Sequence, residues 1–415
     1  MSKLIPLSFD SYEALMRNLT DKEYFSQNLG LERMKRLLSY LGNPEKKFAS
    51  IHIAGTNGKG STAAICAAIF GEAEYKTGLY TSPHLVDFCE RIRVGDENIS
   101  QHGVMRWAKI ISEAPGFETD PLSFFEWTTA MAFLHFAEED VKAAVIETGL
   151  GGRLDATNVI TPKISVITSI AQDHTHHLGA SIQEIAFEKA GIIKPGVPVV
   201  TGPLPSEAME VIREMASTRN SPLVSVDGSA ISDFEVRLEG RHQRENAAVA
   251  VTVMQMFRER EGFLISDEDI QSGLEAVSWP GRLETIQQRP WIVLDGAHNM
   301  AAIRAVVEYF EERLLGRKLT VLFGVMSDKD VQGMLRELGT IAGRFVFTAL
   351  PMKRCASPSV LQEMAQPLEK ESFVFQDVPT ALEFILPDLA SSEVLLVTGS
   401  LFLVGEARQW FEKHA

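Results

Sequence analysis

The chain has 415 residues, of which 45% are hydrophobic and 23% charged. This length exceeds what one core usually supports, and the composition excludes a largely disordered protein, so we expect two globular domains. The net charge of −15 disfavours nucleic acid or an anionic membrane as a partner. The 3 cysteines are widely spaced and indicate neither a disulfide framework nor a zinc site. No signal peptide or membrane-spanning run is evident, which predicts a cytoplasmic protein.

Short apolar runs alternate with helical patterns along the whole chain, which is typical of parallel sheets covered by helices. In the first part, strands are predicted at 50–54, 77–81, 143–147, 164–170 and 197–201, and helices at 59–72, 103–112, 124–138, 181–190, 205–217 and 243–257. A second series of strands follows at 291–295, 319–324, 345–349, 372–376 and 393–398. Pro280-Gly281 makes 280–284 the candidate linker between two domains.

The most informative segment is 49–62, where an apolar strand runs into a glycine turn and then a helical pattern. Backbone N–H groups in such a turn and the positive end of the helix dipole form an anion site, to which Lys59 adds a full charge. The match to the standard phosphate loop is incomplete, because Ile53 and Gly60 stand where that motif has Gly and Ser or Thr. The alternative is an ordinary strand-to-helix turn with a surface lysine.

In its full form this turn resembles the nucleotide loop of the Mur ligase superfamily, and its Lys-Gly-Ser ending resembles the folylpolyglutamate synthase and dihydrofolate synthase branch. The resemblance implies ATP bound by Gly55, Thr56, Asn57, Gly58, Lys59, Gly60 and Ser61. It implies an α/β fold with an N-terminal P-loop-type ATPase domain on a mainly parallel sheet, over 1–282, and folate-binding loops on that domain. A C-terminal Rossmann-like domain of the glutamate ligase type is expected over 283–415.

Three further segments end apolar strands, where parallel α/β sheets bind their ligands. Ser82 belongs to Thr-Ser-Pro-His, Glu147 to Glu-Thr-Gly-Leu-Gly-Gly-Arg, and His174 to Asp-His-Thr-His-His. A carboxylate ending a buried strand is costly unless it is paired or binds a metal, so the alternatives for Glu147 are Mg²⁺ and a salt bridge to Arg153. The resemblance implies that Ser82, Glu147 and His174 hold two Mg²⁺ ions, with a monovalent cation as a further candidate.

The resemblance also implies a catalytic role for Lys59 and His174, and a carbamylated, catalytic lysine at Lys189. From the sequence alone, Lys189 is only a cation near a helix C-terminus, where the helix dipole favours it. The matching family residues that contact the nucleotide are Asn246, Arg282, Asp295 and His298. Each of these also has an ordinary interpretation as a cap, a surface cation or a turn residue.

For the folate substrate the resemblance indicates three segments. They comprise Asn28, Leu29 and Gly30, then Ser123, Phe124, Phe125 and Glu126, and finally Leu154, Asp155 and Ala156. An aromatic ring can stack on a flat heterocycle, although Phe124 and Phe125 at a helix start also suit a core. Asn28 stands where dual-function members often have Asp, which weakens the case for dihydropteroate as an acceptor.

The implied reaction is ATP-dependent addition of L-glutamate to a reduced folate through an acyl phosphate, with dihydropteroate as a second candidate acceptor. One alternative is another Mur-type amino-acid ligase, of the cell-wall or cyanophycin kind, which usually has Thr after the loop lysine. The other is an ATP-driven switch without ligase chemistry. The expected partners are small molecules only, with neither nucleic acid nor membrane, and a monomer is typical of similar proteins.

Overall fold

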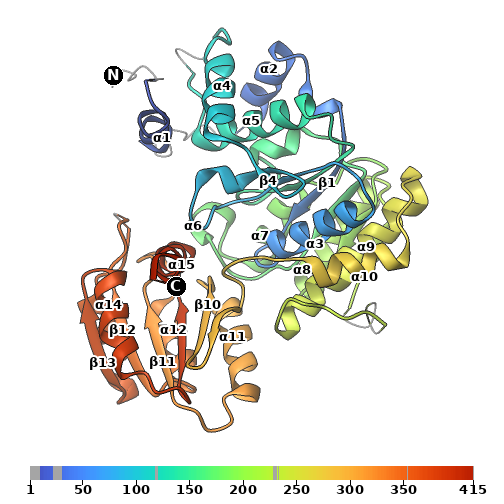
Figure 1. Ribbon diagram of the computed structural model, residues 1–415. Coiled ribbons are helices and arrows are strands. Elements are labelled where there is room, and N and C mark those ends of the chain that lie inside the picture. The colour runs from blue at the N-terminus through green and yellow to red at the C-terminus, as the bar shows by residue number, and fades with distance from the viewer. Residues whose placement is uncertain are drawn as a thin grey trace. The chain divides into compact units, whose positions relative to one another are not determined.

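The computed structural model describes residues 10–21, 30–116, 120–227, 231, 233–352 and 354–414. The chain forms two compact units, which we call the N-terminal and C-terminal units (Figure 1). The N-terminal unit contains the chain up to His84, Phe88–Glu235 and Glu245–Val277. The C-terminal unit contains Ser278–Ala415 together with two short earlier segments, Leu85–Asp87 and Val236–Arg244.

An eight-stranded sheet forms the centre of the N-terminal unit, in the order β4-β3-β2-β5-β1-β6-β7-β8. The strands are β1 (Ala49–Ala54), β2 (Thr77–Tyr80), β3 (Ile92–Val94), β4 (Glu97–Asn98), β5 (Ala143–Glu147), β6 (Ile164–Ile167), β7 (Val199–Thr201) and β8 (Leu223–Ser225). The pairs from β2 to β8 are parallel, whereas β3 and β4 pair antiparallel at one edge. The ends of β1, β2, β5 and β6 therefore lie at the same edge of the sheet.

Helices cover both faces of this sheet. They are α1 (Tyr12–Asp21), α2 (Glu32–Tyr40), α3 (Lys59–Glu72), α4 (Gln101–Ser112), α5 (Phe124–Glu138), α6 (Thr175–Leu178), α7 (Ile182–Ala190), α8 (Ser206–Thr218), α9 (Arg241–Glu261) and α10 (Asp267–Ala276). One core packs α1, α2, α4 and α5 against the sheet, and another packs α7 and α8. Helices α3 and α9 also pack together, where the rings of Phe70 and Phe257 meet edge to face with their centroids 5.2 Å apart.

A six-stranded sheet forms the centre of the C-terminal unit, in the order β13-β12-β11-β14-β10-β9. Its strands are β9 (Glu284–Gln288), β10 (Trp291–Asp295), β11 (Leu319–Phe323), β12 (Arg344–Thr348), β13 (Glu371–Phe375) and β14 (Val394–Thr398). Only β9 is antiparallel to its neighbour.

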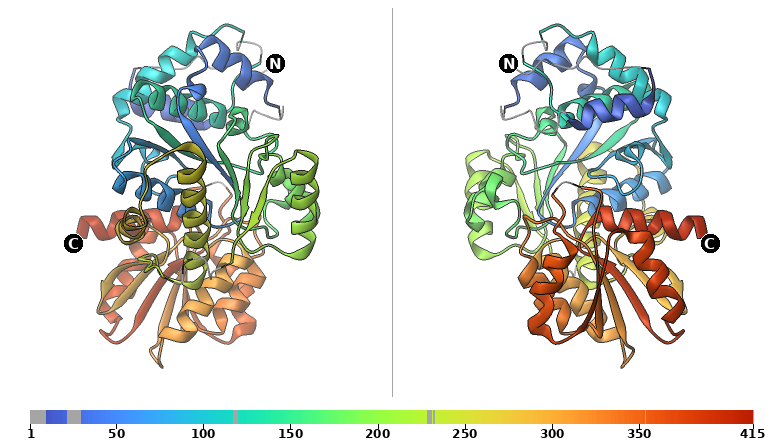
Figure 2. Two further views of the ribbon diagram at one scale, coloured as in Figure 1. Left: turned by 90° about the vertical axis from the view of Figure 1, so that its right-hand side faces the viewer. Right: turned by 90° about the vertical axis from the view of Figure 1, so that its left-hand side faces the viewer.

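Helices cover both faces of this second sheet (Figure 2). Helices α11 (Met300–Arg313), α12 (Val331–Gly339) and α13 (Pro358–Ala365) pack in one core, and α14 (Val378–Ile385) and α15 (Leu401–His414) pack in the other. A parallel sheet with helices on both faces is a doubly wound, Rossmann-like arrangement. The predicted fold class is therefore confirmed for both units. No helix among the described residues is long and apolar enough to cross a membrane.

Candidate active site

The phosphate loop connects β1 to α3 in the N-terminal unit. Gly58 is the N-cap of α3 and has φ 83°, a left-handed conformation that favours glycine. A Cβ atom on Gly58 would lie 2.2 Å from Oδ1 of Asn246, so the loop passes directly against this side chain. The structure thus brings together the loop and Asn246, two parts of the predicted nucleotide site that lie far apart in sequence.

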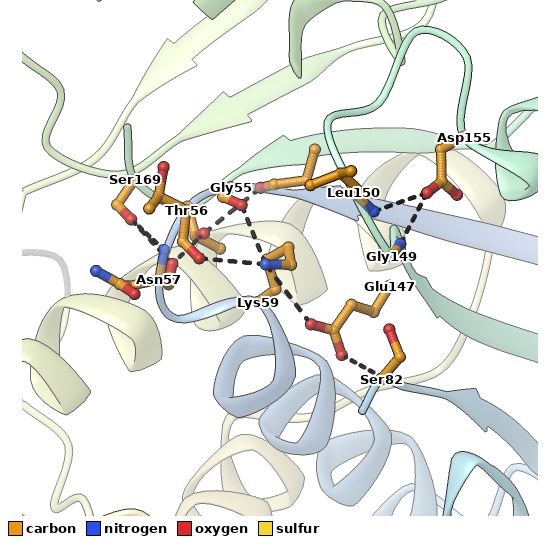
Figure 3. A network of polar contacts seen from close by, with 12 residues as sticks. Gly55, Thr56, Asn57, Lys59, Ser82, Glu147, Gly149, Leu150, Asp155 and Ser169 are labelled. Carbon is orange, nitrogen blue, oxygen red and sulfur yellow. Dashed lines mark hydrogen bonds and ion pairs between the residues drawn. The ribbon is translucent and has the colours of Figure 1, made fainter. Parts of the chain in front are cut away.

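The neighbouring strand end holds this loop in place (Figure 3). The backbone N–H of Thr56 donates to the carbonyl oxygen of Ser169 at 2.8 Å, and the N–H of Asn57 donates to Oγ of Ser169 at 2.9 Å. The hydroxyl of Thr168 also donates to the carbonyl of Asn57 at 2.6 Å. Sequence reasoning missed Thr168 and Ser169 as loop supports, although both are polar residues that directly follow β6.

Two lysines converge on one carbonyl group of the loop. Nζ of Lys59 lies 3.1 Å from the oxygen of Gly55 and 3.2 Å from that of Thr56, and Nζ of Lys189 lies 2.8 Å from the oxygen of Gly55. Lys189 is only 3% exposed. Burial, reinforced by the charge of Lys59, lowers the pKa of Lys189 to about 7. A large fraction of Lys189 is consequently a neutral amine near pH 7.

Glu147 ends β5 and is 4% exposed. Its Oε2 accepts from the backbone N–H of Ser82 at 3.1 Å, and its Oε1 lies 3.9 Å from Nζ of Lys59 (Figure 3). The salt bridge considered for Arg153 is formed instead with Glu188, at 2.8 Å. Ser82, Glu147 and Lys59 are therefore assembled beside the loop. Carboxylate and hydroxyl oxygens are donors that suit Mg²⁺, so these residues fit a phosphate-bound magnesium ion.

His174 has a left-handed backbone, φ 50°, at the start of α6, and its Nε2 lies 4.0 Å from Oδ1 of Asp173. The charge of Asp173 raises the pKa of Lys189, against the larger and opposite effect of burial. Within the described residues, no three His, Cys, Asp or Glu side chains form a group that could hold a metal by themselves. A metal role for His174 therefore stays a prediction.

Asp155 is buried, and both of its oxygens accept hydrogen bonds from the chain. Oδ2 accepts from the N–H groups of Gly149 and Leu150 at 2.9 Å each (Figure 3). Oδ1 accepts from the N–H of Thr157 at 3.0 Å. These contacts fasten the loop that follows Glu147. Ala156 begins a 3-10 turn that Asp155 caps. Contact of Leu154, Asp155 and Ala156 with substrate stays a prediction.

The predicted folate segment at the start of α5 is held by local contacts. Ser123 and Glu126 form a capping box, and Glu126 also accepts from Nε of Arg33 at 3.0 Å. Phe124 is 4% exposed and lies in the core, whereas the ring of Phe125 packs against Gly149, where a Cβ atom would lie 2.5 Å from it. Of the other residues of this prediction, Gly30 is half-buried, and Asn28 and Leu29 lie outside the described residues.

The C-terminal unit gathers the other predicted nucleotide residues at the end of β10. Asp295 is buried and accepts from the N–H groups of Leu283 at 2.8 Å and Ala297 at 2.9 Å. Nη1 of Arg282 lies 3.3 Å from the carbonyl of Gly281. The remaining member is His298, whose Nδ1 lies 2.8 Å from the carbonyl of Gly296. Asp295 thus holds the backbone just before β9 and just after β10, and Arg282 and His298 adjoin Leu283 and Ala297 in the sequence.

A strand, a glycine-rich turn and a helix N-terminus carry Lys59, and the buried Glu147 at the end of a neighbouring strand lies beside them. This arrangement suits a nucleotide-binding site of the Mur ligase type. Residues 53–226 match the Mur ligase middle domain, and residues 281–401 match the Mur ligase glutamate ligase domain. The dihydrofolate synthase/folylpolyglutamate synthase of Bacillus subtilis is 36% identical, over 97% of this chain and 99% of that protein. This chain belongs to the folylpolyglutamate synthase and dihydrofolate synthase family.

Two solved structures are similar over nearly the whole chain. Escherichia coli FolC in complex with DHPP and ADP has a TM-score of 0.90 and 26% identity, covering 99% of this chain and 100% of that one. A bifunctional folylpolyglutamate synthase/dihydrofolate synthase with Mn, AMPPNP and L-glutamate bound has a TM-score of 0.86 and 30% identity, covering 97% and 98%. The suspected family and the fold are therefore both confirmed.

Proposed function

We propose that this protein is an ATP-dependent ligase that joins L-glutamate to a reduced folate, with dihydropteroate as a second acceptor. The observation that carries the proposal is the phosphate loop with Lys59 beside the buried Glu147, whose carboxylate accepts from Ser82. The ligands named for similar structures, which are ADP, DHPP, Mn, AMPPNP and L-glutamate, support the same substrates here.

The chemistry requires two steps. A carboxylate oxygen of the folate attacks the γ-phosphorus of ATP, the bond to the bridging oxygen breaks, and ADP leaves. The amine of L-glutamate then attacks the carbonyl carbon of the resulting acyl phosphate, and phosphate leaves while the amine loses a proton. A carboxylate resists amines until it carries a good leaving group, so the order of the steps follows from the chemistry.

In the first step the protein positions the reactants and stabilises charge. The backbone N–H groups at the start of α3 and the ammonium group of Lys59 hold the phosphates. Ser82 and Glu147 are the residues that would hold Mg²⁺, with His174 for a second ion. When bound, Mg²⁺ neutralises the charge that develops on the phosphate oxygens. From the C-terminal unit, Arg282, Asp295 and His298 are proposed to contact the nucleotide.

Lys189 supports a further part of the proposal, which is carbamylation of this residue. Its pKa of about 7 leaves a neutral amine whose nitrogen can attack the carbon of CO₂. A proton is lost, and the side chain becomes an anion. This change would replace the repulsion between two cations, Lys59 and Lys189, by an attraction. The Nζ atom lies 2.8 Å from the carbonyl of Gly55, so a carbamyl group on it would adjoin the phosphate loop.

Other parts of the proposal concern organisation. We assign ATP binding to residues 1–282 and glutamate ligation to residues 283–415, and we propose that the protein acts as a monomer. The ATP and reduced folate that the reaction consumes support a cytoplasmic location. A bound monovalent cation beside the phosphates is proposed on the family resemblance alone.

Phosphate release by the purified protein tests the proposal. The acceptors are tetrahydrofolate, dihydropteroate and a UDP-muramyl peptide, each assayed with and without L-glutamate. We expect release that requires ATP, L-glutamate and a folate acceptor together, and none with the UDP-muramyl peptide. Release with ATP alone, unaffected by L-glutamate, would show an ATP-driven switch instead, and release with the UDP-muramyl peptide would show a cell-wall ligase.

A further inference from the structure

His52 lies in the middle of β1, the strand that leads into the phosphate loop, and its side chain is completely buried. Its Nε2 lies 2.8 Å from Oγ1 of Thr157. Its Nδ1 has no hydrogen-bond partner among the described residues. A buried ring with an unpaired nitrogen costs stability that an aliphatic side chain would not, so packing alone does not account for a histidine here.

The carboxylate of Asp155, on the far side of Thr157 from His52, determines the direction of these hydrogen bonds. Asp155 accepts from the N–H and the hydroxyl of Thr157 at one oxygen, and from the N–H groups of Gly149 and Leu150 at the other. With Asp155 ionised, the single hydroxyl proton of Thr157 is used, and Oγ1 accepts from His52. Burial lowers the pKa of His52 to about 3, so the ring is a neutral donor through Nε2–H.

We call His52, Thr157 and Asp155 the relay. It ends on the backbone of Gly149 and Leu150, just after the buried Glu147. Gly149 and Leu150 directly follow the Glu147-Thr148 pair, and the N–H of Thr148 donates to the carbonyl of Ile53 in β1 at 2.9 Å. On its other side, Gly149 faces the ring of Phe125, the aromatic residue predicted at the acceptor site. The relay thus fixes the backbone between the buried carboxylate and this ring.

We propose that His52 is a positioning residue for the folate acceptor. It does not touch the substrate. It donates to Thr157, which orients the Asp155 carboxylate, and Asp155 holds Gly149 against Phe125. The inference rests on the proposed function and deepens it, because it assigns acceptor binding to a residue of the nucleotide-loop strand. Loss of the relay should affect the acceptor while leaving the phosphate loop, which is held by Ser169, in place.

Three variants of His52 separate this role from packing. His52→Gln keeps an N–H at about the reach of Nε2, His52→Asn ends near Nδ1, and His52→Leu has no donor. We expect His52→Leu and His52→Asn to raise KM for tetrahydrofolate about tenfold, the scale of one buried hydrogen bond left unmade. KM for ATP should stay within about twofold of wild type in all three, and His52→Gln should restore KM for tetrahydrofolate to within about threefold.

Two controls complete the test. Thr157→Val should reproduce the KM of His52→Leu, and the double variant should be no worse, because both break the same relay. Thr201→Val on β7 removes another fully buried hydroxyl, one that has no hydrogen-bond partner among the described residues, and should leave both KM values unchanged.

The proposal is overturned if the Gln variant behaves like the Leu variant, if KM for ATP rises as much as KM for tetrahydrofolate, or if only thermal stability changes. Failure of the proposed function itself would look different. In that case the wild-type protein would release no phosphate with tetrahydrofolate and L-glutamate, and the role of His52 would fall with it.

Discussion

Replacement of Lys59 by alanine is the sharpest test of whether the phosphate loop acts on the phosphates of ATP. In the structure its ammonium group lies 3.1 and 3.2 Å from two loop carbonyls and 3.9 Å from the carboxylate of Glu147. The side chain is 17% exposed, so its charge is poorly screened. Loss of one such electrostatic contact in a largely dry site lowers turnover by about two to three orders of magnitude, or about 3–4 kcal/mol of barrier. We expect Lys59→Ala to lose that much.

The assay is ADP release that depends on both tetrahydrofolate and L-glutamate. A matched control is Lys76→Ala, since Lys76 forms an ion pair with Glu139 at 2.7 Å on the surface of the same unit, with 49% of its side chain exposed. That pair should contribute at most about 1 kcal/mol to stability and nothing to turnover. If Lys59→Ala turns over at a rate close to wild type, Lys59 does not act on the phosphates and the assignment of the loop is refuted.

Three further predictions concern stability and nucleotide binding. Lys189 has a pKa of about 7 when folded and an ordinary value of 10.5, so the unfolded state binds more protons between these pH values and the free energy of unfolding rises with pH; in CO₂-free buffer, Lys189→Met should flatten the rise in melting temperature from pH 7 to 9. Gly58→Ala places a Cβ on a backbone at φ 83°, so ADP affinity measured by calorimetry should fall by at least about tenfold, and an unchanged affinity would contradict the loop geometry. Gly405→Ala would put a Cβ 2.0 Å from the carbonyl oxygen of Leu85 within the C-terminal unit and should cost about 1–3 kcal/mol in urea unfolding, whereas Gly71→Ala, a helical site with nothing within 4 Å, should not destabilise.

The central strands of both sheets could be predicted because buried parallel strands read as short continuous apolar runs. The predicted strand at 50–54 corresponds to Ala49–Ala54, and the one at 291–295 to Trp291–Asp295. The edge strands β4 and β9 were missed for a physical reason. Both residues of Glu97–Asn98 are exposed, and Glu284–Gln288 is polar at an edge, so neither shows an apolar run.

The candidate site was predictable where polar residues follow buried strands. Lys59, Ser82 and Glu147 come together because parallel strands end at one edge. Some predicted substrate residues have a structural role that the sequence analysis did not assign. Ser123 and Glu126 have the spacing of a capping box, a signal that was present in the sequence.

Contacts between residues far apart in the chain leave no local pattern in the sequence and could not be predicted from it. Lys189 is buried, and its Nζ contacts the carbonyl of Gly55 in the phosphate loop, although the sequence indicated only a cation near a helix C-terminus. His52 sits in an apolar run, and nothing in the sequence connects it to Thr157, 105 residues later. Similarly, sequence order gives no hint that Leu85–Asp87 belongs to the C-terminal unit.

The most direct measurement of the central claim is a crystal structure of the protein grown with AMPPNP and Mg²⁺. We predict that the β- and γ-phosphates contact the backbone of residues 55–61 and the ammonium group of Lys59, and that a Mg²⁺ ion binds Ser82 and Glu147. A nucleotide bound away from residues 55–61, or an ion bound without either Ser82 or Glu147, would contradict the account.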